Sequence, residues 1–214
     1  MQKVDIAVVD YGMGNLRSVS QAVAHVAQGK KVVVTSDAEV IKNAERIIFP
    51  GQGAMPDCMR ELEARGLRGA MIEAAQNKPF FGICIGMQLL FDHSEEGDTP
   101  GLGLLKGNVK RFEPAKMVDA KGEKLKVPHM GWNQVYQTKP HILWHGVAEA
   151  TRFYHVHSYY AAPQNDAVSA GETEYPNRFT SAVAFENIFA TQFHVEKSAQ
   201  AGLQLLSNFI NWKP

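Results

Sequence analysis

The chain has 214 residues, of which 45% are hydrophobic, and its 22 lysines and arginines balance its 22 aspartates and glutamates. This length and composition predict one soluble globular domain over residues 1–214. Because no block of like charge stands out, the sequence argues against the basic surface that binding to nucleic acid requires.

The first half alternates short apolar segments with amphipathic ones, which is typical of a parallel sheet covered by helices on both faces. The expected strands are residues 4–10, 31–35, 46–50 and 79–83. The expected helices are residues 16–27, 59–64, 67–75 and 85–91, with a further short helix opened by Ser36, where Glu39 three residues later matches a capping box. These elements predict an α/β fold.

The second half is richer in β-forming residues. We expect strands within residues 108–112, 152–161, 167–173 and 181–193, with a hairpin-like turn at Glu186 and Asn187. A closing helix over about residues 198–211 carries Leu203, Leu206 and Phe209 at helical spacing. No internal repeat or linker divides the chain.

The lack of targeting signals and the number of cysteines indicate the compartment and the kind of cysteine chemistry. The apolar run from Phe80 to Phe91 is too short to cross a bilayer, and the N-terminal residues lack a secretory signal, so we expect a cytoplasmic protein without a membrane partner. Cys58 and Cys84 are too few for a disulfide framework, and spacings typical of metal ligands are absent. We expect no metal or other cofactor, and any cysteine chemistry should use a free thiol.

Cys84 lies in the apolar stretch "PFFGICIGMQLLF", with Gly82 and Gly86 two residues to either side. A strand, a sharp turn and a helix with this pattern form the thiol counterpart of the nucleophile elbow G-x-S-x-G. The glycines would let strand and helix approach closely, and a helix that starts at Ile85 would favour the thiolate. The alternative is a small buried hydrophobic residue, which is common for a free cysteine.

A base and its orienting group are expected near the C-terminus, in "ATQFHVEKS". The apolar strand there ends in His194, and Glu196 two residues later can reach the same side of an extended segment. Both this motif and the elbow follow predicted strands of an α/β sheet, where such folds place their sites. Together they favour a Cys84, His194 and Glu196 triad over a partly exposed histidine beside a surface glutamate.

The turn "FPGQGA" is a third element of the predicted site. Gly51, Gln52 and Gly53 follow a strand, and such a glycine-rich turn can direct backbone N–H groups at the oxyanion of an acyl-transfer intermediate. Alone, the turn is equally well explained by backbone geometry. The loop Gly12-Met13-Gly14 does not predict a dinucleotide site, because Arg17 stands where G-x-G-x-x-G needs its third glycine.

With these motifs in order, the chain resembles the class I glutamine amidotransferases, whose cysteine lies in a G-x-C-x-G elbow and whose His and Glu form H-x-E. The resemblance runs nearly end to end with one branch, the glutaminase subunits of imidazole glycerol phosphate synthases in histidine biosynthesis. It is carried by "DYGMGNLRSV", "PGQGA", "GICIGMQLLF", "SEEG", "VPHMGWNQV", "HVHSYY" and "FHVEKS". It implies a flavodoxin-like three-layer sandwich with a largely parallel central sheet and an added antiparallel portion in the second half.

The resemblance also implies residue roles. Cys84 would attack the carboxamide of glutamine, His194 would carry the proton to the departing ammonia, and Glu196 would orient His194. Backbone N–H groups of Ile85 and of the turn at Gln52 would hold the oxyanion. The residues that match substrate-binding positions are Gly51, Gly53, Gln88, Glu96, His157, Ser158 and Tyr159. Gln88 could instead be a polar residue of a helix face, Glu96 a charged loop residue, and the segment from His157 to Tyr159 part of a strand with alternating polar positions.

The partner implied by the resemblance is a (β/α)₈-barrel cyclase, which receives the ammonia through a channel and forms imidazole glycerol phosphate and an aminoimidazole carboxamide ribotide. Asn15 and Trp132 are candidate contacts in this heterodimer, since aromatic anchors are common in interfaces, although Trp132 could equally lie in the core. Two positions depart from the family pattern: Gln52 replaces a usual valine, and Val195 replaces a usual proline, which would loosen the backbone beside His194.

Three other functions stay open at this point. One is a glutaminase that serves a different synthase, which the triad alone cannot separate but "DYGMGN" and "PHMGWN" argue against. Another is a cysteine hydrolase or chaperone-like protein of related fold, which usually takes its histidine from the segment right after the nucleophile, and "IGMQLLF" has none. The third is a non-catalytic binding module with an inert thiol.

Overall fold

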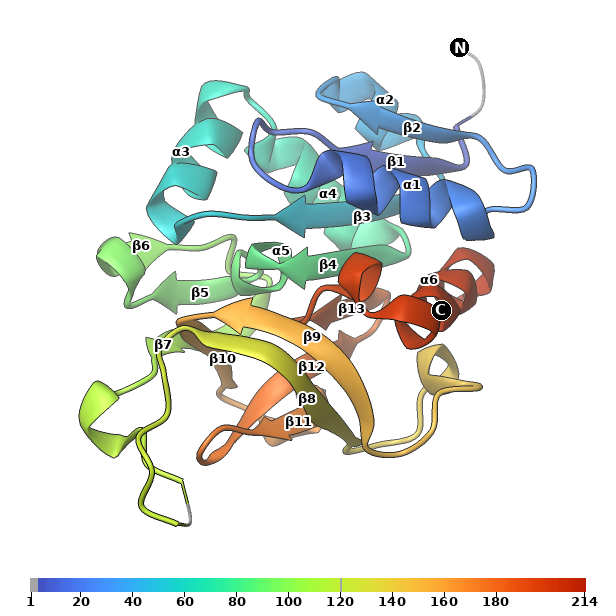
Figure 1. The fold of residues 1–214 in the computed structure, drawn as a ribbon. Helices are drawn as coiled ribbons and strands as arrows, with labels where there is room; N and C mark the ends of the chain where they lie inside the picture. The colour runs from blue at the N-terminus through green and yellow to red at the C-terminus, as the bar shows by residue number, and fades with distance from the viewer. Residues whose placement is uncertain (1–3, 120) are drawn as a thin grey trace.

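The computed structural model describes residues 4–119 and 121–214, and within these ranges thirteen strands join in one sheet (Figure 1). The strands are β1 (Ile6–Val9), β2 (Val32–Thr35), β3 (Arg46–Gly51), β4 (Phe80–Cys84), β5 (Phe91–Ser94), β6 (Thr99–Pro100), β7 (Leu105–Arg111), β8 (His129–Gln137), β9 (Thr151–His157), β10 (Tyr159–Pro163), β11 (Ser169–Glu174), β12 (Arg178–Phe185) and β13 (Ile188–Thr191).

Six α-helices and five short 3₁₀ helices connect these strands in the described residues. The α-helices are α1 (Leu16–Val26), α2 (Ala38–Asn43), α3 (Met55–Ala64), α4 (Arg68–Asn77), α5 (Ile85–Gln88) and α6 (Ala199–Asn211). The 3₁₀ helices are η1 (Glu96–Asp98), η2 (Pro114–Lys116), η3 (Ile142–Trp144), η4 (Asp166–Val168) and η5 (Val195–Lys197). Within residues 4–119 and 121–214, every helix is too short or too polar to cross a bilayer.

The parallel part of the sheet has the order β2, β1, β3, β4, β13, and all four neighbouring pairs run parallel. All four residues of β1 are buried, as expected for a parallel strand covered on both faces. Figure 1 shows α1 in front of these strands and α4 behind them, and α1 packs with α6 while α2 packs with α4. The predicted α/β sandwich is therefore confirmed.

The antiparallel part is added at β12, which pairs with β13, β10 and β11. The segment predicted at residues 152–161 is two strands that separate at Ser158: β9 pairs with β8, whereas β10 pairs with β7 and β12. Strand β8, which pairs with β9 over seven residues, was not predicted, because its polar residues and Gly131 obscure the alternation. The second half is antiparallel as expected, but with more strands.

Three predicted helix boundaries were wrong. The short second helix begins at Ala38, with Asp37 as its N-cap: its carboxylate accepts the N–H of Glu39 at 2.8 Å, so Ser36 does not form a capping box. Helix α3 begins at Met55 rather than residue 59, and Pro56 suits its first turn. The helix expected over 85–91 ends at Gln88, because Phe91 begins β5.

The order of the strands brings the three predicted motifs together. Strands β3, β4 and β13 are neighbours and parallel, so their carboxyl ends meet at one edge of the sheet. Gly51 at the end of β3 pairs with Cys84 at the end of β4, and Thr191 at the end of β13 pairs with Ile83. The chain segment that contains His194 therefore starts beside the cysteine.

Candidate active site

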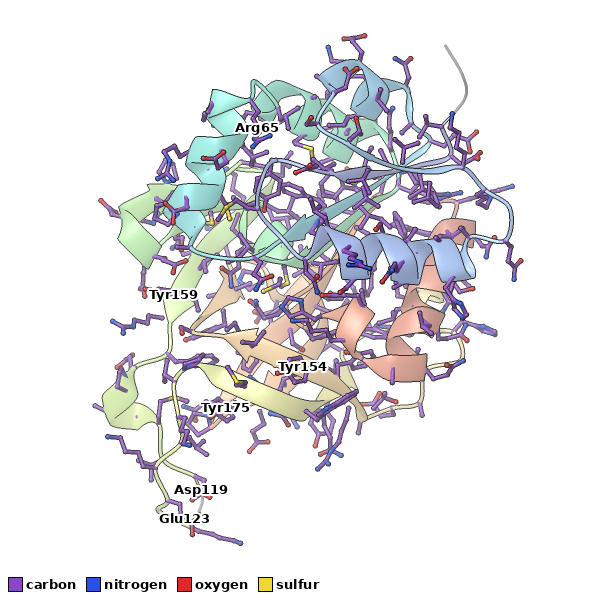
Figure 2. All side chains as sticks on the ribbon, turned by 45° about the horizontal axis from the view of Figure 1, so that its top comes forward. Arg65, Asp119, Glu123, Tyr154, Tyr159 and Tyr175 are labelled. Atoms are coloured by element: carbon purple, nitrogen blue, oxygen red, sulfur yellow. The ribbon has the colours of Figure 1, made fainter. Side chains whose placement is uncertain are left out.

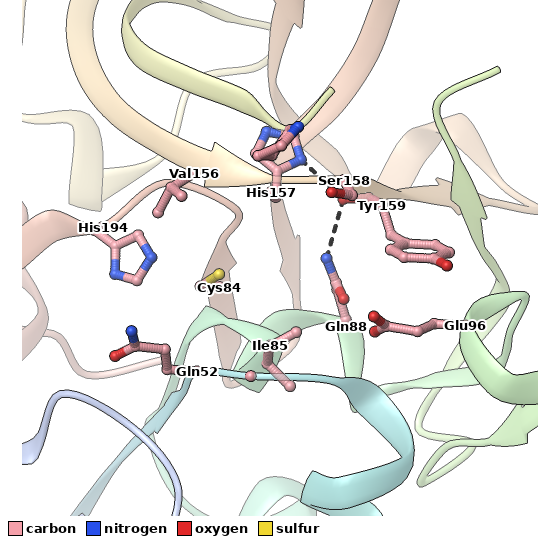
Figure 3. Close-up of a pocket in the computed structure, with 12 residues that line it drawn as sticks. Gln52, Cys84, Ile85, Gln88, Glu96, Val156, His157, Ser158, Tyr159 and His194 are labelled. Carbon is pink, nitrogen blue, oxygen red and sulfur yellow. Dashed lines mark hydrogen bonds between the residues drawn. The ribbon is translucent and has the colours of Figure 1, made fainter. Parts of the chain in front are cut away.

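The turn at Cys84 has the strained backbone that the sequence predicts. Cys84, the last residue of β4 and the residue before α5, has φ 56° and ψ −109°. A non-glycine residue with positive φ is held there only when the surrounding structure determines it. The side chain is 4% exposed and lines a cavity, so the thiol is presented to that cavity rather than packed in the core (Figure 3).

The flanking glycines are required by close backbone contacts. A Cβ atom on Gly86 would lie 1.9 Å from the carbonyl oxygen of Phe49, and one on Gly82 would lie 2.8 Å from the carbonyl oxygen of Gly86. Real Cβ atoms are excluded at both distances. The steric role predicted for the two glycines is therefore confirmed, because any side chain there would push α5 away from β3 and β4.

Replacing Gly86 by alanine should lower the free energy of unfolding by at least about 3 kcal/mol, because the added methyl group meets backbone atoms that cannot rotate away. Urea unfolding of the purified variant measures this loss. Gly69→Ala is the matched control: Gly69 lies in α4, and a Cβ atom there would have no neighbour within 4 Å, so alanine should stabilise the helix by about 0.5–1 kcal/mol. Equal stability of the two variants would contradict the steric argument.

His194 and Glu196 form a buried pair. Nδ1 of His194 lies 2.8 Å from Oε1 of Glu196, and the two side chains are 3% and 0% exposed. The sequence interpretation assumed an extended chain between them. In the structure the chain instead enters η5 at Val195. The main chain of His194 is held by the carbonyl of Tyr154, which accepts its N–H at 2.9 Å, and by the hydroxyl of Ser198, which donates to its carbonyl at 2.6 Å.

The charge of His194 depends on its two neighbours. Burial lowers its pKa, but the influence of Cys84 and the hydrogen bond to Glu196 outweigh burial and raise the pKa to about 10. The ring is therefore an imidazolium near neutral pH. Because Glu196 binds Nδ1, the other nitrogen is free for the reacting groups, and Figure 3 shows the ring beside Cys84 in the cavity.

Val195, which departs from the family pattern, is 1% exposed. A Cβ atom on Gly202 of α6 would lie 1.8 Å from the carbonyl oxygen of Val195, so the helix packs directly on this peptide. In the family pattern a proline ring restrains the backbone beside His194. Here the close packing of α6 on the Val195 peptide provides that restraint.

The turn at Gly51, Gln52 and Gly53 lies against the elbow. A Cβ atom on Gly51 would meet the N–H of Gly86 at 2.8 Å and the hydroxyl oxygen of Tyr11 at 2.6 Å, and Gly53 has φ 111°. The thiol of Cys58 donates to the carbonyl of Gln52 at 3.8 Å. Burial raises the pKa of Cys58 to about 11, so this second cysteine stays a protonated thiol that supports the turn from behind.

These elements enclose a cavity of about 240 Å³. Its lining includes most of the residues predicted from the sequence: Gln52, Gly53, Cys84, Ile85, Gln88, Glu96, His157, Ser158, Tyr159 and His194. Gly51 is not in this lining but pairs with Cys84 in the sheet. Figure 3 shows His194 on one side of Cys84 and the side chains of Gln88 and Glu96 on the other.

Gln88 and Glu96 present acceptors in this cavity. Nε2 of Gln88 donates to the carbonyl of Tyr159 at 3.1 Å, and its buried Oε1 has no hydrogen-bond partner among the described residues. One carboxylate oxygen of Glu96 accepts the N–H of Met55 at 2.8 Å. An unpaired amide oxygen beside a carboxylate suits a ligand that carries an ammonium group.

Three histidines on β8 and β9 form a cluster, His129, His155 and His157, and His157 also lines the cavity. The ring centroids of His129 and His155 lie 4.8 Å apart, Tyr175 covers His129 at 3.9 Å, and Figure 2 shows Tyr175 within this antiparallel half. Burial lowers the pKa of His129 to about 4; burial and the nearby His129 lower that of His157 to about 3. Burial also lowers the pKa of His155. All three rings are neutral near pH 7.

This cluster should make the fold sensitive to acid. In the unfolded chain a histidine takes up a proton below about pH 6.5, whereas the folded state keeps these rings neutral, so stability must fall as the pH drops from about 6.5 towards 4. Each neutral ring contributes about 1.4 kcal/mol per pH unit in that window. His155→Phe should therefore reduce the slope of unfolding free energy against pH by about that amount.

Urea unfolding at pH 7, 6 and 5 measures this slope. Tyr175→Phe is the control, because it keeps the stacked ring and removes no imidazole, and it should retain the slope of the unchanged chain. An unchanged slope in His155→Phe would show that this histidine is already protonated in the folded protein.

The two residues predicted for the partner interface do not line the cavity. Trp132 is 49% exposed on β8 and contacts Tyr154 edge to face, so the interpretation that placed it in the core was wrong. Asn15 precedes α1 as its N-cap residue, and its side chain makes no capping bond. Trp132 leaves a large exposed aromatic surface outside the cavity.

Sequence reasoning missed Gln192. It is fully buried, and its Nε2 lies 3.8 Å from Sγ of Cys84 while its Oε1 accepts from Nε2 of Gln88 at 3.0 Å. A signal was present: residue 192 is two positions before His194, and alternate residues of an extended segment lie on the same side.

Comparison with known proteins gives one family. The model of the family "Glutamine amidotransferase class-I" matches residues 7–212. The chain is 64% identical over 210 residues to "Imidazole glycerol phosphate synthase subunit HisH" of Aromatoleum aromaticum, covering 98% of this chain and 99% of that protein. It is 63% identical over 209 residues to the protein of the same name from Dechloromonas aromatica, covering 98% and 97%.

Solved structures agree at the level of the fold. The structure of PurLQS from Thermotoga maritima superposes with a TM-score of 0.70 at 19% identity, covering 98% of this chain and 99% of that chain. A glutamine amidotransferase from the same organism superposes with a TM-score of 0.62 at 12% identity, covering 94% and 80%.

Proposed function

This chain belongs to the class I glutamine amidotransferases, and from that premise we propose that it is the glutaminase subunit of an imidazole glycerol phosphate synthase. The proposal is supported by relatives of that name at 57–64% identity over nearly the whole chain. It is carried by one observation in the site: the thiol of the Cys84 elbow and the ring of His194, whose Nδ1 is bound by the buried Glu196, face the same cavity.

In this proposal the Cys84 thiolate attacks the side-chain carbonyl carbon of glutamine, and the π electrons of that carbonyl move to its oxygen. When the tetrahedral intermediate collapses, the C–N bond breaks and the imidazolium of His194 gives its proton to the departing nitrogen, which leaves as ammonia. His194, now neutral, takes a proton from water as that water attacks the thioester, and glutamate and the thiol are released. Glu196 keeps His194 in the required orientation throughout.

The oxyanion of each intermediate needs donors that are in place before the reaction. The backbone N–H of Ile85 at the start of α5 and that of Gln52 in the adjoining turn are the proposed donors. Their support is structural: α5 and the turn are locked together at Gly51 and Gly86, whose added Cβ atoms would meet neighbouring backbone.

The substrate's ammonium would bind the carboxylate of Glu96 and the unpaired Oε1 of Gln88. The segment His157-Ser158-Tyr159 would hold its carboxylate. Both ring nitrogens of His157 are engaged within the protein, with Tyr159 and His129, so the hydroxyl and backbone groups of this segment are the groups left for a ligand.

The partner in this proposal is a (β/α)₈-barrel cyclase in the cytoplasm, which receives ammonia through a channel and joins the chain as a heterodimer. Residues 1–214 form one amidotransferase domain in this assembly. The exposed Trp132 and the half-buried Asn15 are proposed contacts, because a half-exposed tryptophan is a suitable interface anchor.

The test is the release of glutamate from glutamine by the chain alone and by the chain mixed with the cyclase subunit and its nucleotide ligand. We expect release to appear or to rise strongly only in the complete mixture. Release that is independent of this partner would keep the glutaminase and assign it to another synthase. No release in either condition, with both proteins folded, would overturn the proposal.

A further inference from the structure

The buried Gln192 has contacts on both ends of its carboxamide. Its Nε2 lies 3.8 Å from Sγ of Cys84, and its Oε1 lies 3.0 Å from Nε2 of Gln88. Its backbone N–H is also fixed, because it donates to the carbonyl of Ser181 at 2.8 Å. Gln192 therefore joins the nucleophile to the substrate-binding side of the cavity.

The carbonyl of Tyr159 determines which group donates and which accepts in these hydrogen bonds. Nε2 of Gln88 lies 3.1 Å from the carbonyl oxygen of Tyr159, which can only accept, so the NH₂ end of Gln88 must face it. The second hydrogen of that NH₂ group is then donated to Gln192, whose facing atom must be the oxygen. This leaves the NH₂ end of Gln192 directed at the sulfur of Cys84.

The carbonyl of Tyr159 also fixes the tautomers of His157 and His129. Nδ1 of His157 lies 2.8 Å from the carbonyl oxygen of Tyr159, so Nδ1 carries the hydrogen and Nε2 is an acceptor. Nδ1 of His129 lies 3.0 Å from that Nε2 and must donate to it. Both rings are neutral because they are buried, so the tautomers stay fixed and the carbonyl of Tyr159 is held by two donors.

An N–H group that points at a thiol sulfur interacts more strongly with the thiolate than with the thiol, because the charged acceptor forms the stronger hydrogen bond. The raised pKa of His194 provides a cation on one side of the sulfur, and the amide of Gln192 is a neutral donor next to it. The imidazolium of His194 attracts the negative charge of the thiolate from any direction. The amide of Gln192, which forms a directional hydrogen bond, also restricts the position of the sulfur.

We propose that Gln192 is a positioning residue for the nucleophile: its NH₂ group, oriented by Gln88 and the Tyr159 carbonyl, donates to Sγ of Cys84 and favours the reactive thiolate. This inference builds on the proposed glutaminase, but it concerns the state of the sulfur before any substrate binds. Its test therefore does not need glutamine turnover.

The experiment measures the rate at which iodoacetamide alkylates Cys84 between pH 5 and pH 10, followed by mass spectrometry of the peptide that contains residue 84. Gln192→Met removes the donor with little change in volume. Gln192→Glu keeps the oxygen that accepts from Gln88 and places a second oxygen where the NH₂ group was. We expect alkylation at pH 7 to slow about tenfold in Gln192→Met and further in Gln192→Glu, with both pH profiles moved to higher pH.

The matched control is Gln137→Met, because Gln137, the last residue of β8, is a half-buried glutamine outside the cavity lining whose NH₂ group donates to the backbone carbonyl of Val147. Its alkylation profile should match that of the unchanged chain. Thermal unfolding identifies any variant that is not folded. If one Gln192 variant does not fold, the alkylation profile of the other one tests the inference. Profiles of a folded Gln192 variant within twofold of the unchanged chain would overturn the inference.

Failure of this inference differs from failure of the proposed function. If the unchanged chain is alkylated rapidly at Cys84 but releases no glutamate with its partner, the function is wrong and the alkylation comparison still tests Gln192. If glutamate is released but the Gln192 variants are alkylated normally, only the role of Gln192 is wrong.

Discussion

Cys84→Ser should abolish glutamate release in the complete mixture with the cyclase and its ligand. A serine hydroxyl is not ionised near neutral pH and needs a neutral base to take its proton. The variant loses the thiolate, and with it the interaction with Cys84 that helps to raise the pKa of His194, so the thiolate–imidazolium pair that starts the reaction cannot form. The loss should be at least about 10⁴-fold, which puts the remaining rate at the limit of a glutamate assay.

Cys58→Ser is the control for this result. Cys58 is buried behind the Gln52 turn, and burial raises its pKa to about 11, so it has no reacting role. A serine hydroxyl can also donate to the carbonyl of Gln52, and most of the activity should remain. A large loss in Cys58→Ser with an intact fold, or activity that survives in Cys84→Ser, would mean that the wrong thiol had been identified.

His194→Ala should lower kcat by at least about 10²–10⁴-fold, the usual effect of removing a positioned acid and base. Two functions are lost together: the cation beside the sulfur and the proton for the departing nitrogen. KM should change less, since Gln88 and Glu96 lie on the other side of Cys84. Steady-state glutamate release over a range of glutamine concentrations separates the two constants.

Glu196→Gln is the informative comparison for His194. The amide oxygen can still accept from Nδ1 of the ring, but the negative charge that favours the imidazolium is gone. We expect a smaller loss of kcat than in His194→Ala. Equal losses would show that the carboxylate does more than orient the ring, and a His194→Ala variant within tenfold of the unchanged chain would remove His194 from the mechanism.

The side chains of the proposed triad could be identified from the sequence because their patterns are local. The G-x-C-x-G elbow needs glycines wherever a helix turns back on its strand, and the contacts of Gly82 and Gly86 show that steric reason directly. Helix boundaries were less predictable. Whether Asp37 or Ser36 caps α2 depends on which side chain meets a free N–H, and α5 ends early because Phe91 pairs with Leu105, which is remote in sequence.

Gln192 and the histidine cluster could not be predicted in the same way. Gln192 meets Gln88 across 104 positions of the chain, and His129 meets His157 because the unpredicted strand β8 pairs with β9. The spacing of two residues from His194 indicates only that the two side chains share one side of the segment, not which groups Gln192 contacts. Its partners are known only when β4, β13, β12 and β10 are placed in order in the sheet.

By itself, the sequence determined the α/β class, the strained turn at Cys84 and the pairing of His194 with Glu196, since each depends on residues within a few positions of one another. Tertiary structure alone decided which face of Cys84 meets His194, which nitrogen of each histidine carries the hydrogen, and that Trp132 is exposed. The reason is physical: hydrogen-bond direction and burial are set by neighbours in space, and sheet pairing brings those neighbours from distant parts of the chain.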